Sequence, residues 1–397
     1  MKKPQLSLSV ALLPLIVLVV LLTYNVTIFG DDALNGSNQF ILLLGGGVAG
    51  LLGLRNKVTY GEMLRKVGEN LQSVTGPILI LLLVGALSGT WLLSGIIPAM
   101  IDYGLQIANP RFFLPACILI SALVSLATGS SWSTSATIGI ALIGIGKALD
   151  LPVGMVAGAV ISGAYFGDKL SPLSDTTNLA PAMAGSELFA HIRYMLYTTL
   201  PCIVITLLLF IVLGWSFSSS GEVNTSFLSE SIREKFNITP WLFLVPLIVI
   251  IMIIKKTPSL LALFVGTLLG GLFALIFQPQ LLMDLSESSV LNFKTIYKSI
   301  FNAITVDTQI KTNDPLLNEL FSSGGMHGML GTVWLIICAM VFGGVMDAIG
   351  ALQAISNAFL KWAQTNFQLI AGTAATSLTV NLTASDQYLA IVVPGKM

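Results

Sequence analysis

The chain has 397 residues, of which 55% are hydrophobic and only 10% are charged, and its formal net charge is zero. Soluble globular proteins carry about 25% charged residues, so this composition cannot cover the surface of a soluble protein. The balanced charge gives no indication of a nucleic-acid partner. A soluble enzyme with buried helices is excluded because Pro77–Pro98 and Tyr197–Trp215 contain no charge. Such runs of about 20 residues cross a hydrocarbon core of about 30 Å.

The first predicted span begins close to the N-terminus. Lys2 and Lys3 precede an apolar segment, Leu12–Leu22, in an arrangement that also occurs in signal peptides. No small-residue cleavage site follows before Thr27, and a matching apolar segment recurs in the middle of the chain. We therefore interpret it as a retained first span.

The two halves of the chain resemble each other. Four matches occur in the same order: Leu12–Leu22 with Leu244–Ile254, Leu42–Leu52 with Val265–Leu275, Leu81–Ile96 with Leu335–Gly350, and Ser125–Gly144 with Ser377–Lys396. The last two are separated by 254 and 252 residues. Faint internal symmetry of this kind is typical of duplicated transporter folds.

Charges in the loops indicate that the two repeats are inverted. The loop with Arg55, Lys57, Arg65 and Lys66 is cytoplasmic by the positive-inside rule, as is the N-terminus. The equivalent second-half loop, 278–326, has more acidic than basic residues and is predicted to be external.

The repeat pattern predicts the boundaries of the two halves. We expect a first repeat over 1–216, an external linker over 217–239 and a second repeat over 240–397. The second repeat has no counterpart of the polar region that follows residue 163, so we expect the protein to continue for roughly 50–70 residues beyond Met397.

The first polar hairpin, Thr128–Thr137, contains seven hydroxyl side chains in ten residues. The candidate ligands in it are Thr128, Ser130, Ser131 and Ser133. A continuous helix would direct some of these hydroxyls at lipid, so we expect a broken or re-entrant segment whose oxygens line a cavity and bind a cation. The alternative is that the hydroxyls bond back to helical carbonyls or pack helices closely.

The second polar hairpin, Thr379–Tyr388, is the predicted counterpart of the first. Its candidate ligands are Asn381, Thr383 and Asp386, which add a carboxylate to the same oxygen chemistry. The alternative is a terminal loop without such a role. Asp347, by contrast, is interpreted as a residue at the boundary of its span.

Charged residues recur within the apolar chain at 163–182. A charge inside a membrane segment is costly and usually marks a pathway. Helical spacing would place Asp168, Ser171 and Asp175 on one face, but Pro172 interrupts that helix and is predicted to leave the Asp168 carbonyl bare. We predict a sodium or proton site with Asp168 and Asp175 as its favoured ligands. The alternative is a buried pair of Asp168 with Lys169 that holds helices together.

The segment Gly167–Pro181, with Ala127–Gly139 and Thr383–Met397, resembles the NhaC-type sodium/proton antiporter family, and the resemblance extends along the chain. It implies exchange of cytoplasmic sodium for external protons. It also implies pathway roles for Asp168, Ser171, Ser174, Asp175, Thr176, Asn178 and Asp386. Relatives in this family exchange malate and lactate together with sodium and protons, so an organic-acid exchanger is the alternative, in which Lys169 or Arg193 would pair with the anion.

The expected protein is thus an all-α, polytopic, inverted-repeat secondary transporter with broken helices or re-entrant hairpins. It works by alternating access in the inner membrane, with a cytoplasmic N-terminus, and is not an enzyme. We expect no cofactor besides the transported sodium and protons. The expected partners are sodium ions, protons and the lipid bilayer, without nucleic acid, and a homodimer is left open.

Overall fold

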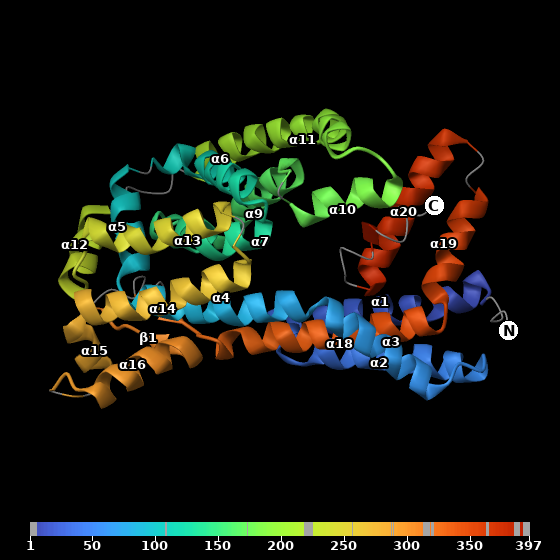
Figure 1. Ribbon diagram of the computed structural model, residues 1–397, viewed down its shortest axis with the longest axis horizontal. Coiled ribbons are helices and arrows are strands. Elements are labelled where there is room, and N and C mark those ends of the chain that lie inside the picture. The colour runs from blue at the N-terminus through green and yellow to red at the C-terminus, as the bar shows by residue number, and fades with distance from the viewer. Residues whose placement is uncertain are drawn as a thin grey trace. The chain divides into compact units, whose positions relative to one another are not determined.

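The computed structural model is almost entirely helical (Figure 1). Its described strands are the short β1 (Thr308–Gln309) and β2 (Ser322–Ser323), which pair antiparallel with Thr308 opposite Ser323. The structure describes residues 6–107, 109–172, 174–217, 225–255, 257–286, 288, 290–312, 318, 321–362, 365–384 and 390–391.

Seven helices in the described part of the chain are long and apolar enough to cross a membrane. They are Leu8–Phe29, Ser37–Arg55, Thr75–Leu93, Arg111–Thr128, Leu188–Ser216, Ser259–Phe277 and His327–Ala348. The bent pair Phe227–Lys235 and Pro240–Ile254, with 85° between its two helices, makes an eighth if it is one span. The prediction of an all-α, multi-pass membrane protein is confirmed.

The chain divides into two compact units, and each contains residues from both predicted halves. Unit 1 comprises 1–78, 179–186 and 330–397, and unit 2 comprises 79–178 and 187–329. Each unit therefore has its own core and is described separately.

Unit 1 is organised around α18, which packs against α2 and α3, while α1 packs against α2 and α19. The bounds are α1 Leu8–Phe29, η1 Gly30–Asn35, α2 Ser37–Arg55, α3 Tyr60–Ser73, α18 Leu330–Ala348, α19 Ala351–Trp362 and α20 Asn366–Ala384. Glycines permit the close packing: a Cβ on Gly344 would lie 2.6 Å from the Val67 Cα, and one on Gly45 would lie 3.3 Å from the Phe342 ring. Lys66 forms 3.0 Å ion pairs with Glu69 and Asp347, so Asp347 is tied to α3.

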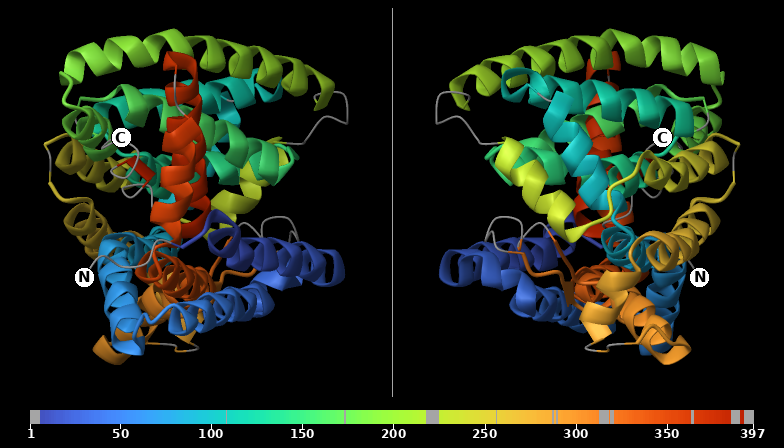
Figure 2. Two further views of the ribbon diagram at one scale, coloured as in Figure 1. Left: turned by 90° about the vertical axis from the view of Figure 1, so that its right-hand side faces the viewer. Right: turned by 90° about the vertical axis from the view of Figure 1, so that its left-hand side faces the viewer.

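Unit 2 contains the larger core. In this unit α11 lies alongside α6 and α9 (Figure 2). The bounds are α4 Thr75–Leu93, α5 Ile96–Ile107, α6 Pro110–Thr128, α7 Ser131–Thr134, η2 Ser135–Gly139, α8 Ile140–Ala148, α9 Val153–Leu170, α10 Asp175–Ala184, α11 Leu188–Phe217, α12 Thr225–Lys235, η3 Pro240–Phe243, α13 Leu244–Ile254, α14 Ser259–Phe277, α15 Pro279–Ser286, α16 Phe293–Thr305 and η4 His327–Met329; α4 and α10 extend into unit 1. Trp91 is buried and donates its indole N–H to the Gly266 carbonyl at 3.2 Å. This bond fixes α4 against α14.

Two runs of three helices share their lengths in order. The helices α4, α5 and α6 have 19, 12 and 19 residues, as do α18, α19 and α20. A glycine with positive φ joins the first two helices of each run, with φ 81° at Gly95 and 76° at Gly350. The likeness agrees with an internal duplication, while the boundaries 1–216, 217–239 and 240–397 stay a prediction. The segment expected as a linker contains α12.

Candidate functional site

Two glycines one helical turn apart bring α9 against α6. A Cβ on Gly163 would lie 2.1 Å from the Ile118 carbonyl oxygen, and one on Gly167 would lie 2.3 Å from that of Ala122. This G-x-x-x-G spacing lets two helix backbones approach closely in a membrane. The Ser125 hydroxyl strengthens the contact by donating to the Ala164 carbonyl at 2.5 Å. Sequence analysis missed this pair, although its spacing was visible.

The close packing places Asp168 beside the first polar hairpin. Asp168 follows Gly167 directly, and its Oδ2 accepts a hydrogen bond from the Ser131 hydroxyl at 3.0 Å. Ser131 is the first residue of α7, just after the chain interruption at Gly129, and its side chain is buried. The structure thus joins two motifs that the sequence suggested separately.

The hairpin is broken, as predicted. α6 ends at Thr128 because Gly129 adopts a left-handed conformation with φ 68°, and the extended Ser130 then caps α7 by accepting the N–H of Ser133. The following turn, η2, is a π-helix, a rare form that is often found at functional sites.

Several hairpin hydroxyls make local bonds. Thr134 and Thr137 donate to the carbonyls of Ser130 and Ser133, as the alternative interpretation expects. Ser133 instead donates to the Ser259 hydroxyl of α14 at 2.9 Å, and the hydroxyls of Thr128 and Thr134 lie 3.5 Å apart. The hairpin therefore combines helix-capping hydroxyls with hydroxyls that reach neighbouring segments.

The loop after α9 differs from the expected arrangement. α9 ends at Leu170 and α10 begins at Asp175, so Asp168, Ser171 and Asp175 do not share one helical face. Ser171 is extended, with ψ 125°, because the following Pro172 disfavours the helical conformation.

The expectation of a bare Asp168 carbonyl is wrong. This oxygen accepts the Ser171 N–H at 3.2 Å and the Thr177 hydroxyl at 3.2 Å. Thr177, which sequence analysis overlooked, also donates to the Lys169 carbonyl. A short side chain in the first turn of α10 thus supplies the Asp168 carbonyl with a donor in place of the N–H that Pro172 lacks.

The remaining predicted residues of this loop cap and brace it. The buried Ser174 accepts the Thr177 N–H and lies 3.1 Å from the Thr176 hydroxyl. The exposed Asn178 donates its amide to the carbonyls of Pro172 and Ser174. Asp175 begins α10, but its side chain lies outside what the structure describes.

The second hairpin is described only in part. Asn381 is exposed on α20, and Thr383 belongs to the same helix without a described side chain. Asp386 lies outside the described residues. Lys169 and Arg193, the residues considered for an anion, are both exposed.

Oxygen atoms dominate the described site, and they come from carboxylate, hydroxyl and carbonyl groups. No group of three or more His, Cys, Asp or Glu side chains that could hold a metal occurs among the described residues. Oxygen donors suit hard cations rather than transition metals.

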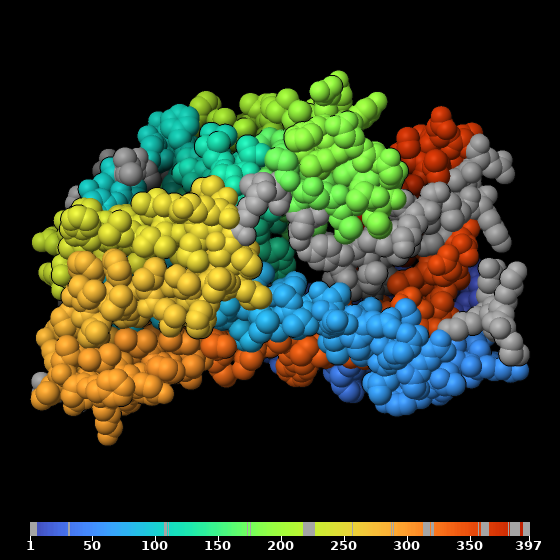
Figure 3. Space-filling model, viewed as in Figure 1, coloured from blue at the N-terminus to red at the C-terminus, as the bar shows by residue number. Residues whose placement is uncertain are grey.

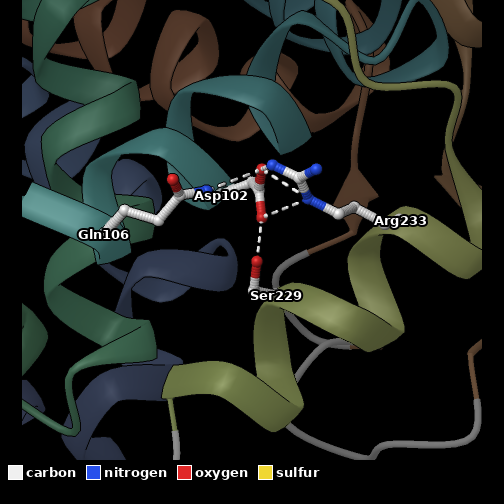
Figure 4. Close-up of polar contacts among 4 residues, drawn as sticks. All are labelled: Asp102, Gln106, Ser229 and Arg233. Carbon is white, nitrogen blue, oxygen red and sulfur yellow. Dashed lines mark hydrogen bonds and ion pairs between the residues drawn. The ribbon is translucent and has the colours of Figure 1, made fainter.

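A second carboxylate, Asp102 on α5, is fully buried in unit 2 and was not anticipated (Figure 4). The Arg233 guanidinium of α12 binds it through Nη2 at 2.8 Å and Nε at 3.1 Å, the Ser229 hydroxyl donates to its other oxygen, and the Gln106 amide donates at 3.3 Å. Ser229 and Arg233 are four residues apart on one helix and so reach the same carboxylate. We interpret this cluster as a clamp between α12 and α5.

Known antiporters resemble this chain over most of its length. The profile described as the Na+/H+ antiporter family matches residues 163–397, which include the Asp168 segment. The chain is 35% identical over 361 residues to the malate-2H(+)/Na(+)-lactate antiporter of Bacillus subtilis, covering 90% of this chain and 74% of that protein.

Two sodium/proton antiporters resemble this chain at nearly the same sequence identity. The Na(+)/H(+) antiporter NhaC of Alkalihalophilus pseudofirmus is 35% identical over 88% of this chain and 72% of its own length. NhaC of Bacillus subtilis is 36% identical over 83% of this chain and 70% of its own length. The chain belongs to the Na+/H+ antiporter family. Membership confirms the resemblance found in the sequence and identifies a transporter family as the setting for the Asp168 site.

Proposed function

We propose that this protein exchanges sodium ions for protons across the cell membrane, with Asp168 as the exchanging carboxylate. The observation that carries the proposal is the meeting of two interrupted helices at this side chain. α6 stops at Gly129 and α9 stops before Pro172, and the Asp168–Ser131 hydrogen bond links the two breaks. Broken helices whose unwound ends supply oxygens are a recurring way for transporters to bind Na+ and H+.

The chemistry of a carboxylate supports exchange. Its oxygens bind either a proton or a hard cation. Because a bare charge within a membrane protein is costly, a bound proton or cation stabilises the carboxylate. Ser131, Thr128, Ser130 and Ser133 would supply further oxygens to a bound cation. The proton and the sodium ion then compete for one site. If the site crosses the membrane with one of the two bound each time, the two ions move in opposite directions.

The loop between α9 and α10 and the second polar hairpin, Thr379–Tyr388, supply the rest of the proposed pathway. Ser171, Ser174, Thr176 and Asn178 would hold the loop that carries Asp175. Asn381, Thr383 and Asp386 would supply the oxygens of the second hairpin, as the repeat predicts.

Alternating access by two inverted repeats would carry the site from one side to the other. The positive-inside rule favours a cytoplasmic N-terminus. A membrane potential adds about 2.3 kcal/mol per charge per 100 mV, so unequal proton and sodium counts would make the exchange voltage-driven. The proposal includes no enzymatic reaction and no resident cofactor, since sodium and protons are cargo.

Vesicles with an imposed pH gradient and an internal pH dye test this function. Sodium added to wild-type vesicles should dissipate the gradient without any organic substrate, and Asp168→Asn should abolish the response. Asp150→Asn is the matched control: Asp150 is exposed and has φ 57°, a conformation that asparagine tolerates. Wild-type sodium response in Asp168→Asn would remove that side chain from the mechanism.

A sodium/proton-coupled organic-acid exchanger is the second candidate, favoured by the malate/lactate antiporter among the relatives. Its anion would pair with Lys169 or Arg193, which are accessible at the surface. The same vesicles loaded with malate or lactate distinguish the two: flux only in loaded vesicles supports the second candidate and contradicts the first.

A further inference from the structure

The helix α16 (Phe293–Thr305) has its aromatic side chains on the outside. Its buried positions are the small residues Thr295, Ser299 and Ala303, and Ser299 donates to the Leu282 carbonyl of α15 at 2.8 Å. Its aromatic residues are exposed, by 81% at Phe293 and 51% at Tyr297. Aromatic side chains are enriched where the hydrocarbon core of a membrane meets water.

The aromatic residues form one continuous stripe. Phe293, Tyr297 and Phe301 are four residues apart, with ring centroids 6.1 Å and then 4.1 Å from each other. A parallel stripe contains Lys294 and Lys298, both exposed, each one residue after an aromatic ring. Neither lysine forms an ion pair with another described residue. α16 therefore presents rings and ammonium groups side by side. The helix itself lies in the orange region at the lower left of Figure 3.

Contacts with two spans indicate the depth of α16 in the membrane. A Cβ on Gly89, four residues before α4 ends, would lie 1.7 Å from the Ala303 carbonyl oxygen. A Cβ on Gly271, six residues before α14 ends at Phe277, would lie 3.2 Å from Ile300. At about 1.5 Å per residue, these contacts lie about 6 and 9 Å inside the ends of the two spans. Amphipathic helices at a membrane interface bury their apolar face to about 5–10 Å.

The helix α3 of unit 1, which lies in the loop that the repeat matches to 278–326, offers a contrast. The basic side chains Arg65 and Lys66 of α3 already bind carboxylates, since both pair with Glu69 and Lys66 also pairs with Asp347. The lysines of α16 lack such partners among the described residues. Their charge complements the phosphate of an anionic lipid, and the adjacent aromatic rings suit the boundary between headgroups and acyl chains.

We propose that α16 is a membrane-interface helix that binds anionic phospholipids. Lys294 and Lys298 contact the lipid phosphate, and Phe293, Tyr297 and Phe301 lie at the acyl boundary. The surface is separate from the Asp168 site, so the proposal does not depend on which ions are exchanged.

The position of α16 is tested by fluorescence quenching on the full chain in vesicles. Tyr297→Cys, in a background with the native cysteines replaced, receives an environment-sensitive dye. Lipids brominated near the headgroup should quench it, and aqueous iodide should not. Quenching by iodide alone would place the helix in water, and protection from both quenchers would indicate a second copy on this face. Either result overturns the proposal.

Headgroup recognition is tested by native mass spectrometry of the purified chain with phosphatidylglycerol and phosphatidylcholine in competition. The wild type should retain phosphatidylglycerol preferentially. Each of Lys294→Gln and Lys298→Gln should lower that preference about fivefold, the equivalent of about 1 kcal/mol per lysine. Lys311→Gln removes the same charge from an exposed residue outside the stripe and should retain the preference. Equal effects of all three variants, or no preference in the wild type, would refute anionic-lipid binding by α16.

Discussion

Replacing Gly167 by alanine should separate α9 from α6 and weaken the Asp168 site. The new Cβ would lie 2.3 Å from the Ala122 carbonyl oxygen and 2.6 Å from the Leu126 nitrogen, both of which are backbone atoms. A flexible side chain could rotate away, but a helix backbone cannot. The two helices must therefore move apart by about 1 Å to regain ordinary contact.

The matched control is Gly158→Ala on the same helix, whose Cβ would meet only the Phe210 ring at an ordinary 3.7 Å. Both variants gain about 1 kcal/mol of helix propensity. Only Gly167→Ala overpacks the interface, at a cost of about 1–3 kcal/mol. The difference between the two variants therefore isolates the packing contribution.

The consequence for function follows from the neighbouring bond. A separation of about 1 Å would lengthen the 3.0 Å Ser131–Asp168 contact beyond hydrogen-bonding distance. The same separation would carry the Ser131 oxygen away from a sodium ion bound at Asp168. Losing one such contact to a charged group costs about 1.5–3 kcal/mol, so the sodium concentration for half-maximal exchange should rise at least about tenfold.

Thermal unfolding in detergent and the vesicle assay measure the two effects on the same preparations. Gly158→Ala should unfold at or above the wild-type temperature and exchange normally. Gly167→Ala should unfold below it and require more sodium. If the two variants behave alike in both assays, the close α6–α9 packing does not position the site and the reasoning is wrong.

Two further predictions concern ion pairs. Arg233→Gln should destabilise the protein by about 3 kcal/mol, the low end for removing one partner of a buried pair, because Asp102 is fully buried whereas Arg233 is half-exposed. Asp102→Asn should cost less. Unfolding of the double variant should show coupling between the two substitutions, and additive effects would exclude the clamp. The hydrogen bond from Lys66 lowers the pKa of Glu69, so this pair stabilises the fold above the ordinary carboxyl pKa and the contribution is lost as the pH falls through the lowered value. Lys66→Gln should therefore unfold below the wild-type temperature at neutral pH, and this gap should narrow as the pH falls through the lowered pKa of Glu69. Lys57→Gln should follow the wild type, and a gap that does not change with pH would contradict the assignment.

Much of the fold was predictable from local chemistry. Uncharged runs of about 20 residues predicted the spans, and the breaks follow from Gly129 and Pro172. Both residues act on their own backbone and need no distant partner. The same reasoning failed for the Asp168 carbonyl because Thr177, nine residues later, supplies a replacement donor.

Pairing between distant helices was much less predictable. Hydroxyl clustering suggested Ser131 and a lone charge suggested Asp168, but nothing local indicated that they would bond across 37 residues. Asp102 escaped notice for the same reason, since its partner Arg233 lies 131 residues away in a segment interpreted as a linker. The glycine spacing at Gly163 and Gly167 was a usable signal for close helix packing.

The sequence by itself determined the membrane class, the places where helices are interrupted and the transporter family. Composition, glycine and proline act through local energetics, and these are the same wherever a helix is placed. Only the tertiary structure decided which side chains meet: Asp168 with Ser131, and Asp102 with Arg233. In a membrane, a neighbouring helix and the lipid are equally apolar, so hydropathy does not tell which face of a span is packed. Small residues, close backbone contacts and interhelical hydrogen bonds make that choice.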